Sequence, residues 1–373
     1  MKLNKNEINE LKDQFLEICS IDNPSGDEGK MAKWVSSQAE GLKCDPITDE
    51  KRNVFFRIPG KGKALLLCAH LDSVQPCIHK KPRFDGKIFI SDGTTILGAD
   101  DGCGISTILT TIKYLKKHKI AHRPIEVLFT SMEEVGGLGI KDFNFSHITS
   151  EEGITVDSVA PVGDIVMKSP YKYRFSFVAH GKASHGGRIS QGLSAIKMMA
   201  DFLHQLPVGE VMEDVFLNVG KIKGGSAINT VPAEAQIQGA IKIKSEGEIR
   251  SGSSDKFDEI VTLINKITNK VQKNYPEGKI FFDYSLQRGG YMFETSDPLV
   301  KSVKKAIKAA GYKPGETESF GVSDANTLNS MGLKSILLGT GVKYAHTTKE
   351  CIQLSDLVGI TEILLHFCTS PLK

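Results

Sequence analysis

The sequence predicts an α/β protein in which a mostly parallel sheet is flanked by helices and interrupted by a smaller inserted module. Two observations predict this fold class. Short apolar runs alternate with amphipathic helical segments before about residue 160 and again after about residue 290, as in a parallel sheet covered by helices. Between these regions the pattern reads β-α-β-β-α-β. We expect residues 1–170 and 291–373 to form one domain and residues 171–290 to form the other.

Three apolar runs mark the first strands of the predicted sheet: Ala64–Ala69, Ile125–Phe129 and Ile154–Val156. Between the first two runs, Gly102–Lys117 has apolar residues at helical spacing, and lysines gather at its C-terminal end, where the helix dipole favours positive charge. We expect this segment to be a crossover helix on the sheet. Another helix is predicted near the N-terminus, where apolar residues also recur at helical spacing: Ile8, Leu11, Phe15 and Ile18.

The inserted module begins with the alternating strand pattern YKYRFSFVAH at Tyr171. A helical segment at 193–203 follows, and two strand-like runs come next, near 214–223 and 231–243. A helix over 257–271 and the strand KIFFDYS complete an order typical of a ferredoxin-like sandwich, which could fold on its own. The polar segment SEGEIRSGSSDK (245–256) is expected to be a connector or loop tip.

The α/β pattern resumes after about Gly290. A helix is predicted through Leu299, Val303 and Ile307, followed by the apolar strand SILLG. A closing helix is predicted from the spacing of Leu357, Thr361, Leu364 and Leu365. Because these elements continue the earlier pattern, we interpret 171–290 as an insertion into the first domain.

Composition excludes several classes of function. The 47 basic and 44 acidic residues leave a net charge of +3, too small and dispersed for a surface that binds nucleic acid or a membrane. The N-terminus is polar and no stretch approaches about 18 consecutive apolar residues, so we expect a cytoplasmic protein. The seven cysteines form no C-x-x-C pair, which favours reduced thiols over a disulfide framework.

Polar residues that could carry chemistry follow the predicted strands. The first strand ends in CAHLDSV, and a period of two places the side chains of His70 and Asp72 on the same face. In open α/β sheets, ligands bind beyond the carboxyl ends of the strands, where this pair lies. An isolated H-x-D is more often a hydrogen-bonded pair in a loop than a functional site. The case for function therefore depends on neighbouring motifs.

Acidic residues occur at three further places of this kind. Asp100 lies in TTILGADDGCGIS immediately before the crossover helix. The alternative to a functional role is a charged residue that caps the start of this helix. Phosphate binding is disfavoured, because two adjacent carboxylates would repel an anion. Glu133 and Glu134 follow the next strand in FTSMEEVGGLG. Two neighbouring acids can divide the work, one binding a cation and the other accepting a proton from water. Asp157 ends the run ITVDS.

Two loop histidines complete the candidates. His346 lies in a glycine-rich loop after SILLG, and His185 lies in GKASHGG inside the inserted module. Two imidazoles and three carboxylates form a set typical of two closely spaced Zn²⁺ ions bridged by a carboxylate and a hydroxide, although Mn²⁺ or Co²⁺ remains open as the working ion. The five residues of this set are His70, Asp100, Glu134, Asp157 and His346.

Other catalytic signatures are missing from the sequence. It has no G-x-S-x-G nucleophile elbow and no H-E-x-x-H zinc motif. The first strand–helix turn also has no G-x-G-x-x-G, which argues against a nicotinamide enzyme.

The sequence resembles the co-catalytic zinc peptidases and amidohydrolases, a family that includes peptidase T, carboxypeptidase G and aminoacylase-1. Motifs matching the family in order span nearly the whole chain and are most similar to the peptidase T-like tripeptidase branch. They are HLDSV, DGTTILGADDG, FTSMEEVGGLG, TVDS, GKASHGG, GGSAINTVPAEA, GVSDANTLNSMGL and HTTKE.

The resemblance implies a role for each candidate residue. His70, Asp100 and Asp157 would hold one zinc, and Asp100 would bridge to a second zinc held by Glu134 and His346. Asp72 would orient His70, and Glu133 would be the general base. The inserted module would be a lid and dimerisation domain, with His185 stabilising the oxyanion in an active site of a homodimer and Asn229 contacting the substrate.

Two positions depart from the family pattern. Gly102 stands where many relatives have lysine, and Lys242 stands where many have an arginine that binds the substrate's terminal carboxylate. Lysine keeps the charge but lacks the planar fork of arginine, so we expect looser recognition of that carboxylate. Our first hypothesis is a di-zinc aminopeptidase that acts on tripeptides or similar short peptides through a metal-bridging hydroxide. The alternatives are an amidohydrolase of N-acyl amino acids or dipeptides, and a non-catalytic binding protein.

Overall fold

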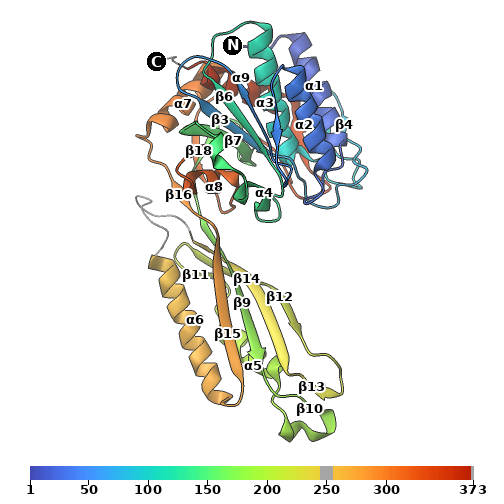
Figure 1. Ribbon diagram of the computed structural model, residues 1–373, viewed down its shortest axis with the longest axis vertical. Helices are drawn as coiled ribbons and strands as arrows, with labels where there is room; N and C mark the ends of the chain where they lie inside the picture. The colour runs from blue at the N-terminus through green and yellow to red at the C-terminus, as the bar shows by residue number, and fades with distance from the viewer. Residues whose placement is uncertain (244–254, 371–373) are drawn as a thin grey trace. The chain divides into compact units, whose positions relative to one another are not determined.

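The computed structural model describes residues 1–243 and 255–370, which divide into two compact units (Figure 1). Unit 1 comprises Met1–Lys168, Phe293–Ser319 and Ser323–Lys373. Unit 2 comprises Ser169–Met292 and the short segment Phe320–Val322. The insertion predicted at 171–290 corresponds to the first segment of unit 2, and no pattern in the sequence predicts the second.

The main sheet of unit 1 is mostly parallel, as the sequence predicted. Its strand order is β1-β2-β6-β3-β7-β18-β8, and β17 pairs with β8. The central strands β6, β3, β7 and β18 run parallel, whereas β2 and β8 pair with them antiparallel. The strands are β1 (Ile47–Thr48), β2 (Val54–Ile58), β3 (Leu65–His70), β6 (Ile125–Thr130), β7 (Glu152–Ser158), β8 (Asp164–Ser169), β17 (Gly315–Glu318) and β18 (Lys334–Gly339).

Helices cover both faces of this sheet (Figure 1). In β3, Leu66 and Cys68 pack with Ile140 and Leu328 of α4 and α8. Because side chains alternate along a strand, the remaining apolar residues of β3 point to the opposite face, where α3 contacts the strand. The helices are α1 (Lys5–Ser20), α2 (Gly29–Gly41), α3 (Ala99–Lys117), α4 (Leu138–Lys141), α7 (Pro298–Ala310), α8 (Asp324–Ser330) and α9 (Leu354–Cys368), with a 3₁₀ turn at Phe145–His147.

A second, three-stranded sheet in unit 1 was not predicted from the sequence. It consists of β4 (Arg83–Phe84), β5 (Ile88–Ile90) and β19 (Cys351–Gln353), in the order β19-β5-β4. Its strands are too short to give a periodic signal. The antiparallel pairing of β19 with β5 fixes the chain just after the loop that contains His346.

Unit 2 contains the predicted β-α-β-β-α-β arrangement. Its sheet has the order β11-β12-β14-β9-β15 with antiparallel neighbours, so β11 is an additional edge strand. The elements are β9 (Tyr171–His180), α5 (Ala195–Gln205), β11 (Gly209–Met212), β12 (Val215–Gly224), β14 (Glu234–Ile243), α6 (Asp255–Asn274) and β15 (Lys279–Arg288). Shorter elements are β10 (Ser184–His185), a 3₁₀ helix (Gly186–Gln191), β13 (Thr230–Val231) and β16 (Tyr291–Met292).

The core of unit 2 lies between its sheet and the helices α5 and α6. Alternate residues of β9 are buried, and Tyr173 stacks on Phe257 of α6 with ring centroids 3.6 Å apart. Phe177 packs against Phe202 of α5. Of the polar segment predicted at 245–256, residues up to 254 lie outside the described part of the chain, and the last two begin α6.

Two further features of the structure concern the state of the cysteines and the apolar character of the helices. All seven cysteines are free thiols. Within residues 1–243 and 255–370, no helix combines the length and apolar character needed to cross a membrane.

Candidate metal centre

His70 and Asp72 lie at the carboxyl end of β3. His70 is the last residue of the strand, and its Nδ1 lies 2.9 Å from the backbone oxygen of Asp72 and 3.4 Å from Oδ1. The Asp72 carboxylate is buried and accepts hydrogen bonds from Ser25 Oγ (2.6 Å), Glu133 N (2.9 Å) and Glu134 N (3.1 Å). One carboxylate therefore holds both the imidazole of His70 and the turn after β6.

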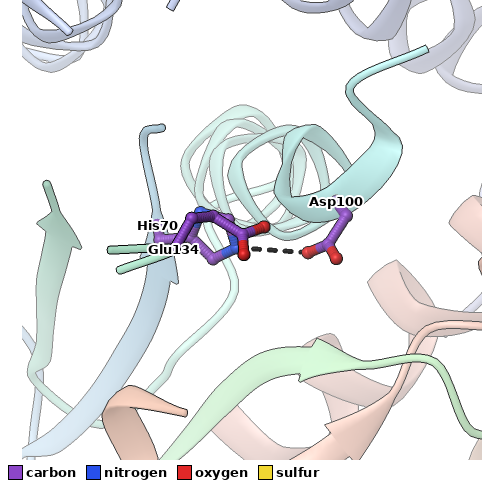
Figure 2. A group of neighbouring side chains, drawn as sticks. All are labelled: His70, Asp100 and Glu134. Carbon is purple, nitrogen blue, oxygen red and sulfur yellow. Dashed lines mark hydrogen bonds and ion pairs between the residues drawn. The ribbon is translucent and has the colours of Figure 1, made fainter. Parts of the chain in front are cut away.

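Asp100 lies between two imidazoles. Its Oδ1 is 3.1 Å from His70 Nε2, and its Oδ2 is 3.3 Å from His346 Nε2. Figure 2 shows Asp100 and His70 from different elements pointing toward one another, with Glu134 beside them. Asp100 and Asp101 have non-helical backbone angles, so the regular helix begins at Gly102, as the sequence predicted.

Glu134 and Asp157 extend the cluster in two directions. Glu134 Oε1 lies 2.9 Å from His346 Nε2, and Asp157 Oδ1 lies 3.6 Å from His70 Nε2. All five side chains predicted as metal ligands therefore come together in unit 1. His346 adopts a left-handed backbone conformation with φ of +63°, which is uncommon for a residue other than glycine.

The turn that carries Glu133 and Glu134 has a second buried support. Met132 precedes the two acids with φ of +52°, and its N–H donates to Glu28 Oε1 at 3.1 Å. The buried Glu28 carboxylate also accepts from Gly26 N at 2.6 Å. A carboxylate from the chain just before α2 thus holds Met132 in a conformation that favours glycine.

The imidazoles and carboxylates of the cluster shift one another's pKa values. Burial lowers the pKa of His70, but hydrogen bonds to Asp100, Asp157 and a third carboxylate outweigh it and raise that pKa well above its ordinary value. Hydrogen bonds to Asp100 and Glu134 raise the pKa of His346 to about 10. Burial raises the pKa of Asp157 to about 7. The pKa of Asp100 is held well below its usual range, because hydrogen bonds from both imidazoles outweigh the effect of burial.

This donor set fits divalent cations. Ligand atoms of His70, Asp100 and Glu134 lie within 4.8 Å of one another, as do those of His70, Asp101 and Asp157. Protons on the imidazoles balance the surrounding carboxylates, and a divalent cation can replace those protons because neutral imidazole and carboxylate are both metal ligands. Mixed imidazole and carboxylate ligands suit zinc as well as neighbouring transition metals.

The other three predicted site residues belong to unit 2. His185 in β10 is exposed, and its Nδ1 accepts a hydrogen bond from Gly187 N at 3.0 Å. Asn229 lies close to it, because the Asn229 backbone oxygen accepts from Gly186 N at 2.7 Å. Lys242 lies on β14, where its backbone pairs in register with Lys172 of β9.

Sequence reasoning missed four acids and hydroxyls that support the cluster. Asp101 is buried and accepts from His70 N at 3.1 Å and from Gly104 N at 3.0 Å, and burial raises its pKa well above the ordinary value. Ser25, Glu28 and Glu350 likewise accept from or donate to the loops that carry the cluster. Asp101 shares the motif before the crossover helix with Asp100, and that position alone does not separate a supporting residue from a ligand. Ser25, Glu28 and Glu350 follow no apolar strand, so the signal that identified His70 and Asp157 does not reach them.

An α/β unit that gathers carboxylates and imidazoles at the carboxyl ends of its strands has the arrangement of a metal-binding site. Residues 66–370 match the model of Peptidase family M20/M25/M40, and the chain belongs to this family. The protein is a peptidase T-like member of it, as the relatives below support.

Relatives and solved structures cover most of the chain. An uncharacterised Bacillus subtilis protein, YqjE, is 28% identical over 95% of this chain and 96% of its own length. Peptidase T from Clostridium perfringens is 28% identical over 76% of this chain and 69% of that protein. Aminopeptidase PepT from Bacillus cereus has a TM-score of 0.85 at 26% identity, covering 97% and 98% of the two chains. A Staphylococcus aureus tripeptidase has a TM-score of 0.87 at 27% identity, covering 97% of each.

Proposed function

We propose that this protein is a di-zinc aminopeptidase that hydrolyses the N-terminal peptide bond of tripeptides or similar short peptides. The observation that carries the proposal is the position of the Asp100 carboxylate between the imidazoles of His70 and His346. Beside it lies the turn with Glu133 and Glu134, which is held by hydrogen bonds to Asp72. Relatives described as peptidase T, aminopeptidase PepT and a tripeptidase support the substrate class.

The proposed ligand sets share Asp100. His70, Asp100 and Asp157 would hold one zinc, and Asp100, Glu134 and His346 would hold the other. Bound there, two zinc ions would polarise the scissile carbonyl and lower the pKa of water toward about 7. Asp72 keeps Nε2 of His70 turned toward Asp100, because it occupies the opposite ring nitrogen.

Glu133 is the proposed general base. It adjoins Glu134 on the turn that Asp72 holds through two backbone hydrogen bonds. In this role Glu133 takes a proton from the attacking water and later delivers it to the leaving amine, a contribution of about 10²–10⁴-fold in rate. The hydrogen bonds from Glu133 N to Asp72 and from Met132 N to Glu28 hold the backbone of the turn that carries the base.

Unit 2 is proposed to act as the lid and as the contact between two subunits of a homodimer. His185 and Asn229 lie together, as a shared substrate-binding role requires. The hydrogen bond received by His185 Nδ1 places the proton of the neutral ring on Nε2, which can donate to an oxyanion. Lys242 would attract the terminal carboxylate of the substrate with its charge, but without a two-pronged grip.

The division of roles is tested with two variants and one control. Glu133→Gln should keep its zinc content and lose about 100-fold or more in kcat, because only the proton acceptor changes. His346→Ala should lose bound zinc, measured by atomic absorption after dialysis. Glu151→Gln, at an exposed residue, controls for loss of a carboxylate. Equal loss of zinc in the first two variants would contradict the assignment.

Substrate profiling tests the reaction itself. The wild-type protein should cleave tripeptides with a free N-terminus and leave their N-acetylated forms intact, whereas the reverse preference would indicate an amidohydrolase. Tripeptide amides should have KM values close to those of the acids, because lysine recognises the carboxylate loosely. Less than one metal ion per chain, with no hydrolysis after reconstitution, would instead indicate a binding protein.

A further inference from the structure

Glu350 places a buried carboxylate under the loop that carries Asp100. Its side chain is 1% exposed. Oε1 accepts a hydrogen bond from Asp100 N at 2.9 Å, and Oε2 accepts from Gly98 N at 2.7 Å. Both oxygens are thus engaged by backbone groups 250 or more residues earlier in the chain.

The loop at 98–100 needs an acceptor from elsewhere. The first N–H groups of a helix have no partner within the helix, and Asp100 also has non-helical angles (φ −90°, ψ 102°). Gly98 is left-handed at φ +77°, and Lys80 Nζ would lie 2.7 Å from a Cβ placed on it. A carboxylate at this end of α3 satisfies two backbone donors and also interacts favourably with the helix dipole.

The same short segment supplies both Glu350 and His346. Glu350 N donates to Thr347 O at 3.1 Å, and Thr347 N donates to Tyr344 O at 3.2 Å. Immediately after Glu350, β19 pairs with β5 through Cys351. Turns on one side and a sheet on the other therefore hold the backbone of the segment that carries both His346 and Glu350.

We propose that Glu350 is a positioning residue that sets the Asp100 carboxylate between the two imidazoles before any cation binds. It fixes the backbone of Asp100 while His346, four residues earlier, faces Asp100 Oδ2. The inference rests on the proposed function for its catalytic consequence, but the hydrogen bonds from Gly98 N and Asp100 N to Glu350 do not depend on that function. Glu350 itself touches neither substrate nor metal in this role.

The test uses the full chain with Glu350→Gln, Glu350→Ala and the exposed-site control Glu151→Gln. Glutamine keeps one acceptor oxygen but turns an NH₂ group toward the second backbone N–H, and alanine removes both acceptors. We expect zinc, titrated as its chloride by calorimetry, to bind about 10- to 100-fold more weakly to Glu350→Gln. In the apo protein, the amide of Gly98 or Asp100 should exchange with solvent about 10-fold faster or more.

The readouts separate positioning from general stability. Circular dichroism and thermal unfolding report whether each variant is folded, and a purely structural role would lower Tm while leaving zinc affinity unchanged. If Glu350→Ala fails to fold, the zinc affinity of Glu350→Gln decides between a positioning role and a purely structural one. Unchanged zinc affinity in folded Glu350→Gln, or fast exchange of both amides in the unsubstituted protein, would overturn the proposal. A wild-type protein that binds zinc but cleaves no peptide would overturn only the proposed function.

Discussion

Replacing Asp72 with asparagine tests whether one carboxylate organises the whole cluster. The substitution keeps the size of the side chain and removes its charge. In the native protein, Oδ2 accepts from Ser25 Oγ and Glu134 N, while Oδ1 accepts from Glu133 N and faces His70 Nδ1. Asparagine offers one acceptor oxygen and one NH₂ donor, so it cannot satisfy both pairs.

The geometry determines the less costly orientation of the new amide. If NH₂ takes the place of Oδ2, the hydroxyl of Ser25 can rotate and accept from it, which leaves only Glu134 N without an acceptor. The opposite orientation leaves Glu133 N without an acceptor and turns an NH₂ group toward His70 Nδ1, which keeps only the backbone oxygen of Asp72. An unsatisfied buried donor costs about 1–3 kcal/mol, so we expect the free energy of unfolding to fall by that amount.

Three measurements on Asp72→Asn check this reasoning. Urea unfolding gives the change in stability, and zinc titration should show about 10- to 100-fold weaker binding, because the side chain beside His70 Nδ1 loses its negative charge. Peptide hydrolysis at saturating zinc should remain well below wild type, since the turn with Glu133 loses the hydrogen bond from Glu134 N to Asp72. Asp27→Asn, at an exposed position two residues after Ser25, is the matched control. Wild-type stability and wild-type zinc affinity together would refute the reasoning.

Three further predictions concern stability, packing and subunit contacts. Burial alone would raise the pKa of Glu126, but hydrogen bonds to its carboxylate lower that pKa below the ordinary value of a glutamate. The ionised carboxylate therefore stabilises the folded protein when the pH is above the ordinary glutamate pKa. This stabilisation is lost as the pH falls through the lowered pKa of the folded state. Glu126→Gln should therefore destabilise the protein by about 1–3 kcal/mol in urea at pH 7 and by less near pH 3, and an equal loss at both would contradict this. Gly104→Ala should weaken zinc binding and cost about 1–3 kcal/mol, because its Cβ would lie 2.5 Å from a buried carboxylate, whereas Gly41→Ala meets nothing within 4 Å and should be tolerated. If His185 acts across a homodimer, mixing a His185→Ala subunit with one that lacks the general base should restore part of the activity, and no rescue would indicate a role within one chain.

The sequence alone could predict the strand-end residues of the cluster. His70 and Asp157 come directly from the apolar strands β3 and β7, and parallel strands bring their carboxyl ends to one edge of the sheet. Asp100 was predicted from its position before the crossover helix. In each case a long periodic element stands next to the functional residue, so the position of the residue follows from the position of the element.

The supporting residues could not be predicted in this way. Glu28 and Glu350 act through hydrogen bonds to backbone groups that lie 104 and 250 residues away in the chain. Their partners depend on how loops fold, and loops carry no hydrophobic periodicity. The sheet β19-β5-β4, which fixes the chain after Glu350, was missed because its strands have only two or three residues.

The supporting acids share a physical role that follows from the charge of the cluster. The three carboxylates of the ligand set repel one another unless protonated imidazoles or cations balance their charge. Asp72, Asp101, Glu28 and Glu350 each accept hydrogen bonds from the backbone of segments that carry proposed ligands. These backbone hydrogen bonds oppose the repulsion in addition to the contacts that the imidazoles make with the carboxylates of the ligand set. Substitutions of these acids should therefore weaken metal binding even though none of them is a proposed ligand.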